Sequence, residues 1–359
     1  MEDPIVDDLK FSLSDKQKIK KIREEVILSS RELKQLFPIL QHQNAIGMSI
    51  MLFAVSMIVT ASYFFLTGHL SPWILVPWNA FWMAILHELE HDTIHYMYFK
   101  KNKAIQNFML LTLWVFRPTT INPWFRRHLH FNHHRVSGTK ADIEERSVTN
   151  GEPWSMKRLI STPDLILGGI LRMPTIKKDI IEMVKSGQMT REEALTLKRQ
   201  NALGFLPFGI FIYIIWYVFV IHYLLHGFCS LLQIPYTSPH WIQAQFTWIN
   251  PLVAILIAPN MLRQFCLHFI TSNMHYYGDV EPGNIMQQTQ ILNIWWLIPL
   301  QLFCFNFGST HAIHHFVVGE TFYIRQLTAA RAHRIMLEMG VRCNDLSTFS
   351  RANRFTISR

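Results

Sequence analysis

Histidines recur in this chain at spacings that suit the binding of metal ions. His87, His91 and His95 are four residues apart, so on a helix they fall close to one stripe. A neutral imidazole ring is a ligand for iron, copper, zinc or nickel. The stripe indicates a metal site, although for this segment alone a polar helix end with capping histidines explains it equally well. Three further groups follow: His130, His133 and His134, then His275, then His311, His314 and His315.

The repetition of these histidines favours metal binding over the polar helix end. The spacing HxxHH occurs twice in the chain, beside one stripe of the type HxxxH. One HxxHH is weak evidence, whereas two matched copies are strong evidence. An ion takes about four to six ligands, so ten histidines suit two ions. We set the neighbouring His128 and His268 aside as non-ligands, and ligand chemistry alone does not choose iron.

The composition indicates that much of the chain lies in lipid. Half of the 359 residues are hydrophobic and 16% are charged, against about 25% charged in an average soluble domain. Residues 35–86 and 201–262 contain no Lys, Arg, Asp or Glu. A membrane span needs about 20 apolar residues, so each stretch has room for two crossings. We predict four spans, at about 45–66, 71–86, 202–225 and 248–269.

The distribution of basic residues predicts the orientation. Lys and Arg crowd residues 10–34, 100–200 and 325–359 and are absent from the loops at 67–71 and 226–247. By the positive-inside rule, both hairpin tips are external, and the termini and the histidines are cytoplasmic. The apolar runs 104–116 and 291–307 are predicted to be interfacial or re-entrant, because a crossing at either would separate the histidine groups.

These elements predict an all-α integral membrane protein of two helical hairpins, with a cytoplasmic helical cap that carries a histidine-rich dimetal site. Residues 1–44 form a cytoplasmic segment with an interfacial helix, capped at Ser14 and with an apolar stripe that includes Ile22 and Val26. Residues 45–325 form the membrane domain, and 326–359 form a cytoplasmic tail. The segment between 134 and 201 contains a capping box, Thr190 to Glu193. It covers the site or serves as a solvated linker.

Charge and cysteine content exclude other classes. The formal net charge of +9 lies on the polar segments and suits a membrane surface or an acidic partner. No nucleic-acid-binding motif accompanies it, so we expect no nucleic-acid partner. The four cysteines are scattered without a CxxC pair, which predicts neither a disulfide framework nor a thiolate metal site.

The histidine motifs resemble those of the membrane fatty acid desaturase and hydroxylase superfamily, which includes the alkane hydroxylases. His87 to His91 (HELEH) resembles the first box, Trp124 to His134 the second, and Gly308 to Phe316 the last. The motif around His275 (MHYYG) resembles the single-histidine motif that precedes the last box. The resemblance covers about residues 45–325. It implies a non-haem site with two iron ions, dioxygen as the oxidant, and four spans beneath a cytosolic cap.

Carried over by position, the resemblance implies a set of ligands. His95 is either a ligand, in an alternative register with His91, or a partner that orients one. Some family members have an Asn four residues before the single histidine, where this chain has Thr271, and Asn273 lies two residues before it, so the accessory ligand stays open. The ligands implied by the match are His87, His91, His130, His133, His134, His275, His311, His314 and His315.

Carboxylates near the motifs could orient ligand imidazoles through the second ring nitrogen. Solvated or ion-paired roles are the alternative for each of them. The candidates are Glu88, Glu90, Asp142, Glu144 and Glu145.

The predicted function is the O2-dependent desaturation of a fatty acyl chain or related long-chain lipid. A hydroxylase of alkyl chains or alkanes, a monooxygenase, would use the same ligands and is the nearest alternative. A metal transporter or a zinc-bearing membrane receptor is the non-enzymatic alternative. A transporter would place its ligands within the spans near the membrane midplane, whereas these lie at the predicted span ends.

The electron donor is predicted to be a separate protein. No haem-binding or ferredoxin-like segment is visible in the chain. The basic cytoplasmic face suits an acidic donor of the ferredoxin, rubredoxin or cytochrome b5 type. Arg126, Arg127 and Lys140 are the basic residues expected to contact it.

Overall fold

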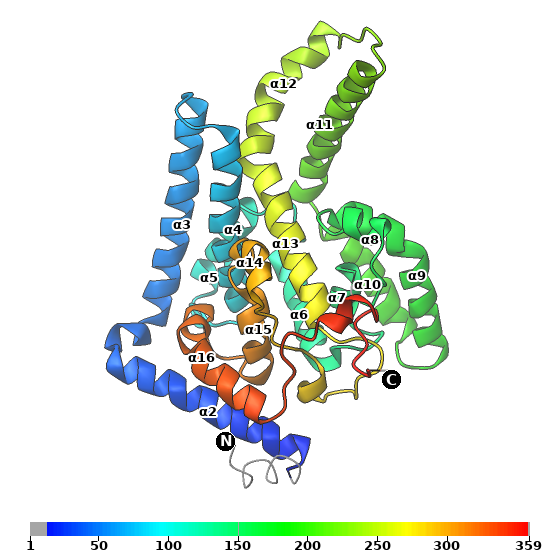
Figure 1. The fold of residues 1–359 in the computed structure, drawn as a ribbon. Helices are drawn as coiled ribbons and strands as arrows, with labels where there is room; N and C mark the ends of the chain where they lie inside the picture. Colours follow the sequence, from blue (N-terminus) through cyan, green and yellow to red (C-terminus); the bar gives the residue numbers. More distant parts are fainter. Residues whose placement is uncertain (1–12, 150, 358–359) are drawn as a thin grey trace.

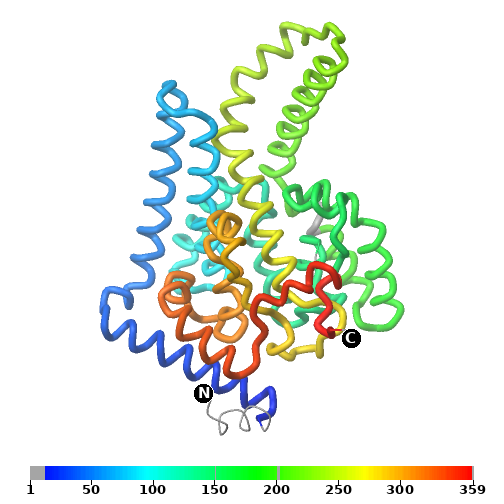
Figure 2. The backbone as a smooth tube through the Cα atoms, viewed as in Figure 1, coloured from blue at the N-terminus to red at the C-terminus, as the bar shows by residue number. Residues whose placement is uncertain are grey.

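The computed structural model describes residues 13–149 and 151–357, and these are almost entirely helical. They contain no strand, only isolated β-bridges that join His275 to Thr289 and Ile291 to Cys343. Two long hairpins rise from a broader helical body (Figure 1). The tube in Figure 2 follows the chain from the first hairpin, through the body, to the second hairpin and back. The all-helical fold expected from the sequence is confirmed.

The first hairpin consists of α3 (Gln43–Leu66) and α4 (Pro72–Ile94). Ser71 is the N-cap of α4 and Pro72 occupies its first position, where the missing N–H of proline costs no hydrogen bond. α4 does not stop where the apolar sequence ends at Leu86. It continues for two more turns, so its histidines lie on the same rigid element as the predicted span.

The second hairpin consists of α11 (Phe208–Leu231), then α12 (His240–Leu252), the π-helical turn η2 (Val253–Ile257) and α13 (Ala258–Met274). The last three form one continuous helix. The wide turn follows Pro251, which cannot donate the backbone hydrogen bond that a regular α-helix needs at this point. α13 leads directly into His275, which is its C-cap residue.

Among the described residues, three helices are long and apolar enough to cross a membrane: Gln43–Leu66, Phe208–Leu231 and the continuous helix His240–Met274. The helix expected at 202–225 begins at Phe208 instead, because the preceding helix, α10 (Arg191–Leu203), extends to Leu203 and Pro207 precedes α11. The span predicted at 71–86 lies in α4, which is not among the three, so it stays a prediction.

The apolar runs 104–116 and 291–307, which are predicted to be interfacial or re-entrant, do not form long helices. The first becomes α5 (Lys103–Val115), whose 13 residues extend about 20 Å, against about 30 Å of hydrocarbon. Residues 291–307 are divided between the short helices η4 (Trp295–Leu297) and α14 (Ile298–Leu302) and the turns around them. Their interfacial placement stays a prediction.

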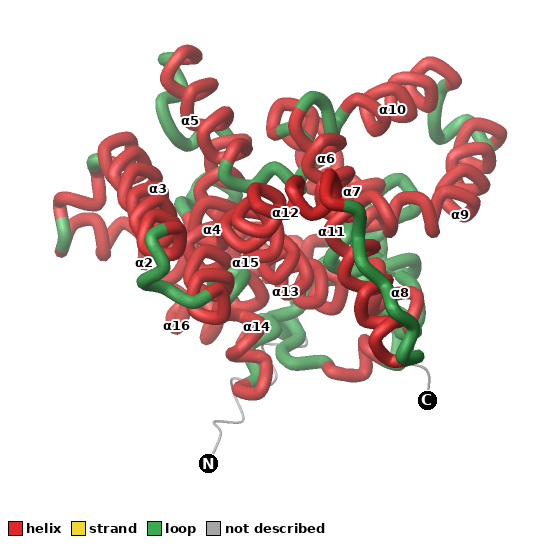
Figure 3. Tube along the Cα trace, turned by 90° about the horizontal axis from the view of Figure 1, so that it is seen from above, coloured by secondary structure: helices red, strands yellow, loops and turns green. Residues whose placement is uncertain are grey.

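The remaining helices form the body below the hairpins. Seen along the hairpins, α5, α9 (Leu165–Lys185) and α10 lie at its periphery, while α4, α13 and α15 (Phe307–Phe316) lie near its centre (Figure 3). The predicted capping box is present, since Thr190 caps α10 and Glu193 returns a hydrogen bond. The body helices are α6 (Pro123–Val136), α7 (Ile143–Ser147), α8 (Met156–Ser161), α9 (Leu165–Lys185), α10 (Arg191–Leu203), η3 (Ile285–Gln287), α15 (Phe307–Phe316), α16 (Phe322–Glu338) and η5 (Leu346–Phe349).

α2 (Asp15–Leu36), followed by η1 (Pro38–Gln41), runs across the body opposite the hairpin tips (Figure 1). Its apolar stripe faces protein, because Ile22 and Val26 are fully buried in the core cluster that includes α15 and α16. Arg23 Nε donates to Phe316 O at 2.9 Å, which fixes α2 beneath α15. Exposed apolar side chains gather at its end, including Leu36.

We expect labelling to place the hairpin tips on one side of the membrane and the body on the other. A single cysteine at His69 or Gln233, both exposed tip residues, should react with an impermeant maleimide in intact cells, and one at Lys178 on α9 should not. Ser238, in the same loop as Gln233, is unsuitable for labelling because it is buried beside His226. Labelling of Lys178→Cys from outside would contradict the orientation. The chain ends, 1–12 and 358–359, and residue 150 lie outside the described residues.

Candidate metal centre

The end of α4 points three histidines into the body. Every residue from Met83 to Ile94 is buried, so His87 and His91 face protein, and His95, the C-cap residue, is half-buried. His91 Nε2 lies 2.9 Å from His130 Nε2, and His95 Nε2 lies 3.1 Å from His314 Nε2. The two lower histidines of the stripe therefore meet side chains from two other helices.

α6 presents its histidines to two different neighbours. Asn122 caps this helix, accepting a hydrogen bond from Phe125 N at 2.8 Å. His130 and His134, four residues apart, have their Nε2 atoms 3.1 Å apart. His133 projects differently, and its Nε2 lies 3.4 Å from His315 Nε2.

α15 repeats this division in the opposite sense. Its pair at a spacing of four, His311 and His315, has Nε2 atoms 3.3 Å apart, while His314 Nε2 lies 3.0 Å from His134 Nε2. Gly308 lets this helix approach the preceding segment, because a Cβ there would lie 2.6 Å from Leu292 O. Each HxxHH motif thus contributes to both sides of one centre.

The histidines form two groups in which the ligand atoms lie within 4.8 Å of one another. Nine of the ten predicted ligands belong to them. His275 enters from the end of α13, with its Nε2 3.3 Å from His315 Nε2. The first histidine group is His91, His95, His130, His134 and His314, and the second histidine group is His133, His275, His311 and His315.

The donor set fits two ions that favour imidazole ligands. Burial lowers the pKa of His130 and His315 well below the usual value, and that of His275 to about 3, so these rings are neutral and able to bind a metal. A neutral ring has one N–H, yet His315 Nε2 faces three other Nε2 atoms at 3.3–3.4 Å. Hydrogen bonds cannot satisfy such a cluster, whereas a cation at its centre can.

His133 is the exception among these rings. Burial lowers its pKa, but the carboxylates of Asp142, Glu145 and Glu144 together outweigh burial and raise the pKa to about 9. A raised pKa means that the ring holds a second proton, and a metal ion that binds Nε2 would compete with the proton on that nitrogen.

Carboxylates from one short segment hold the second nitrogens of three rings. Asp142 Oδ2 lies 2.8 Å from His133 Nδ1, and Glu144 Oε2 lies 2.8 Å from His130 Nδ1. Glu145 Oε2 lies 3.5 Å from His275 Nδ1. Such contacts fix a ring's orientation and raise its basicity as a ligand. The positions of Asp142, Glu144 and Glu145 therefore agree with the expectation that carboxylates orient the rings.

Glu88 and Glu90 contact arginines instead. Glu90 pairs with the buried Arg117 and, at 2.8 Å, with Arg126. Glu88 pairs with Arg325 at 3.2 Å, and Arg325 Nη1 also lies 2.8 Å from His314 Nδ1. Arg117 and Arg325 belong to none of the motifs recognised in the sequence. The sequence indicated them only indirectly, because acidic residues beside an apolar span need cationic partners when they are buried.

His87 lies outside both histidine groups. Its Nδ1 is 2.9 Å from Arg117 Nη1, and its buried Nε2 has no hydrogen-bond partner among the described residues. The sequence match pairs His87 with His91 as ligands. In the structure His95, and not His87, lies in the same group as His91. The sequence-based prediction that His87 is a ligand is untested by this arrangement, and each group can hold an ion without it.

The residues set aside or left open also have definite places. His128 is exposed, and His268 Nδ1 lies 2.9 Å from Thr162 O. Thr271 Oγ1 lies 3.1 Å from His275 Nδ1, so it contacts the back of that ring. Asn273 accepts from Trp154 Nε1 at 3.0 Å and is turned away.

Two of the basic residues expected to contact a donor are not surface groups. Arg126 is occupied by Glu90 and Glu144. Arg127 is buried, with its guanidinium over the Tyr96 ring. Lys140, whose side chain is 57% exposed, is the one of the three that a partner can reach.

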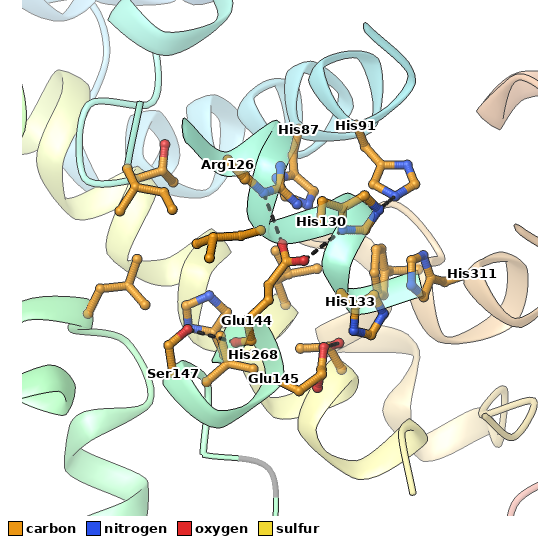
Figure 4. Close-up of a pocket in the computed structure, with 18 of the residues that line it drawn as sticks. His87, His91, Arg126, His130, His133, Glu144, Glu145, Ser147, His268 and His311 are labelled. Atoms are coloured by element: carbon orange, nitrogen blue, oxygen red, sulfur yellow. Dashed lines mark hydrogen bonds and ion pairs between the residues drawn. The ribbon is translucent and has the colours of Figure 1, made fainter. Parts of the chain in front are cut away.

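A cavity of about 90 Å³ lies against both histidine groups. His91 and His130 line it from the first group, and His133 and His311 from the second. Figure 4 shows these rings around the same space as Glu144, with Arg126 above the carboxylate. A small substrate portion held here would lie beside both sets of nitrogens.

Comparison with known proteins gives one finding. The model of the fatty acid desaturase family matches residues 68–347, which is 280 of the 359 residues. Searches of curated proteins and of solved structures gave no significant match.

Proposed function

The chain belongs to the fatty acid desaturase family, and from this premise we propose that it is a membrane di-iron oxidoreductase that desaturates a fatty acyl chain or related long-chain lipid with O2. Membership of this family supports the class of activity, which is that of a membrane desaturase or hydroxylase. The observation that supports two irons is the pair of histidine groups, whose buried or half-buried rings bring their nitrogens together in two places.

We assign one iron to each group. His91, His95, His130, His134 and His314 would hold the first ion, and His133, His275, His311 and His315 the second. When bound, the two irons would supply activation of O2 and the oxidising power that an unactivated C–H bond requires. A zinc-bearing receptor or a transporter would not need an imidazole-lined cavity beside both ions.

The protein itself contributes orientation and the exclusion of water. Asp142 and Glu144 hold His133 and His130 by their second nitrogens, so these rings keep one direction. Leu129, Leu267 and Phe307 line the cavity between the polar groups and limit access of water to it. Electrons would come from a separate acidic donor that meets the basic cytoplasmic face, including Lys140.

The function is tested by expressing the full chain with iron and analysing lipids by mass spectrometry. Desaturation appears as a loss of two hydrogens, and hydroxylation as a gain of one oxygen. We expect about two irons per chain and a desaturated product that depends on O2 and reductant. Full activity in protein that contains only zinc would contradict the di-iron proposal, and an exclusively hydroxylated product would favour the monooxygenase alternative.

A further inference from the structure

Arg263 is a buried cation without an anionic partner among the described residues. Its side chain is about 1% exposed, and neither terminal nitrogen has a hydrogen-bond partner in the part of the chain that the structure describes. Arg263 Nε donates a hydrogen bond to Asn260 Oδ1 at 3.4 Å. Two other fully buried arginines behave differently: Arg117 pairs with Glu90 and Arg325 with Glu88. An unpaired buried charge is destabilising, so a ligand is the natural source of its counter-charge.

The position of Arg263 is equally unusual. It lies in the continuous helix His240–Met274, which is apolar enough to cross a membrane. A guanidinium stays charged in proteins. Ionisable residues in such helices mark functional sites by default, because lipid and helix packing both disfavour them.

Arg263 lines the cavity that the two histidine groups share. A water needs about 10–15 Å³ of such volume, so 90 Å³ holds several waters, or a carboxylate and its first few carbons. It does not hold a whole long chain or a bulky head group. The nearby Leu129, Leu165, Leu267 and Phe307 provide apolar wall beside the charge.

We propose that Arg263 binds the carboxylate of a free fatty acid, so that the carbons next to the carboxylate lie closest to the histidine groups. A carboxylate matches the guanidinium in charge and in two-point geometry. A thioester or phospholipid ester offers only a neutral carbonyl there and leaves Arg263 uncompensated. This inference deepens the proposed function and rests on it for the oxidation, but not for the binding.

The binding test compares two lipids that differ only in head-group charge. The full chain in lipid nanodiscs should bind palmitate at least tenfold more tightly than palmitamide. Arg263→Gln should abolish this preference, and Arg263→Lys should keep part of it. Arg191→Gln, which removes an exposed arginine on α10, is the matched control and should keep all of it. Equal binding of the two lipids by the unaltered protein would overturn the proposal.

Stability separates a binding role from a structural one. Without lipid, Arg263→Gln should have a melting temperature equal to or above that of the unaltered protein, because an unpaired charge is removed. Palmitate should raise the melting temperature of the unaltered protein and not that of the variant. A variant that melts earlier without lipid, yet is still stabilised by palmitate, would show that Arg263 is structural.

The position of oxidation gives an independent readout. Palmitate deuterated at carbons 2 and 3 should lose deuterium during turnover, and palmitate deuterated at mid-chain should not. Oxidation of palmitoyl thioester without oxidation of palmitate would overturn the carboxylate proposal and leave the proposed function intact. Failure to bind iron would overturn the proposed function while leaving the palmitate preference measurable.

Discussion

His315→Ala is expected to abolish turnover and to lower the iron content from about two to one or fewer per chain. His315 Nε2 is central in the second histidine group, within 3.4 Å of the Nε2 atoms of His133, His275 and His311. Removing it takes a ligand from an ion that has four candidate histidines in all. We expect the rate of turnover to fall at least 100-fold. Substitution of the residues that hydrogen-bond to metal ligands already lowers metal affinity or activity by about 10- to 100-fold. Iron analysis and product formation measure the two effects.

His128→Ala is the control for this experiment. It removes an imidazole from the helix that carries His130, but His128 is exposed and belongs to neither group. Iron content and turnover should stay within about twofold of the unaltered protein. If His128→Ala lost iron while His315→Ala kept two ions, the assignment of ligands would be wrong.

The second large effect separates the two registers of the first motif. His95→Ala should lose iron from the first histidine group and abolish turnover, because His95 Nε2 lies 3.1 Å from His314 Nε2 inside that group. His87→Ala should keep about two irons, because His87 contacts Arg117 rather than the other rings. His87 lines the cavity, so its loss is expected to affect substrate oxidation more than iron content. The opposite pattern of iron content would restore the register that begins at His87.

Much of the centre could be predicted because metal ligands are few in kind and regular in spacing. His130, His133 and His134 were recognised from one HxxHH motif, and a helix necessarily spreads such residues over neighbouring faces. Helical geometry also explains why His130 and His134 stay together while His133 turns toward His315.

The register of the first motif could not be predicted, for a geometric reason. His87, His91 and His95 have the same spacing, so the helix offers two equivalent pairs. The choice depends on where α6 and α15 end against α4, and only tertiary packing determines this. The same holds for Asp142 and Glu144, which reach His133 and His130 from the short helix α7 and its cap.

Arg263 shows a signal that was present and not used. The uncharged stretch ends at Leu262, and the predicted span 248–269 nevertheless contained this arginine. A charge inside a predicted span is a reason to look for a ligand. What the sequence alone does not show is that no carboxylate of the described residues pairs with it.

Because α12, η2 and α13 form one continuous helix, the thickness of the bilayer can affect the position of His275 in the metal centre. A helix longer than the surrounding hydrocarbon tilts to match it. Here no loop intervenes between the candidate span and His275, so a tilt is transmitted to that ring, while α6 and α15 belong to the body. Host membranes with acyl chains of different length would therefore set different separations between His275 and the other members of its group.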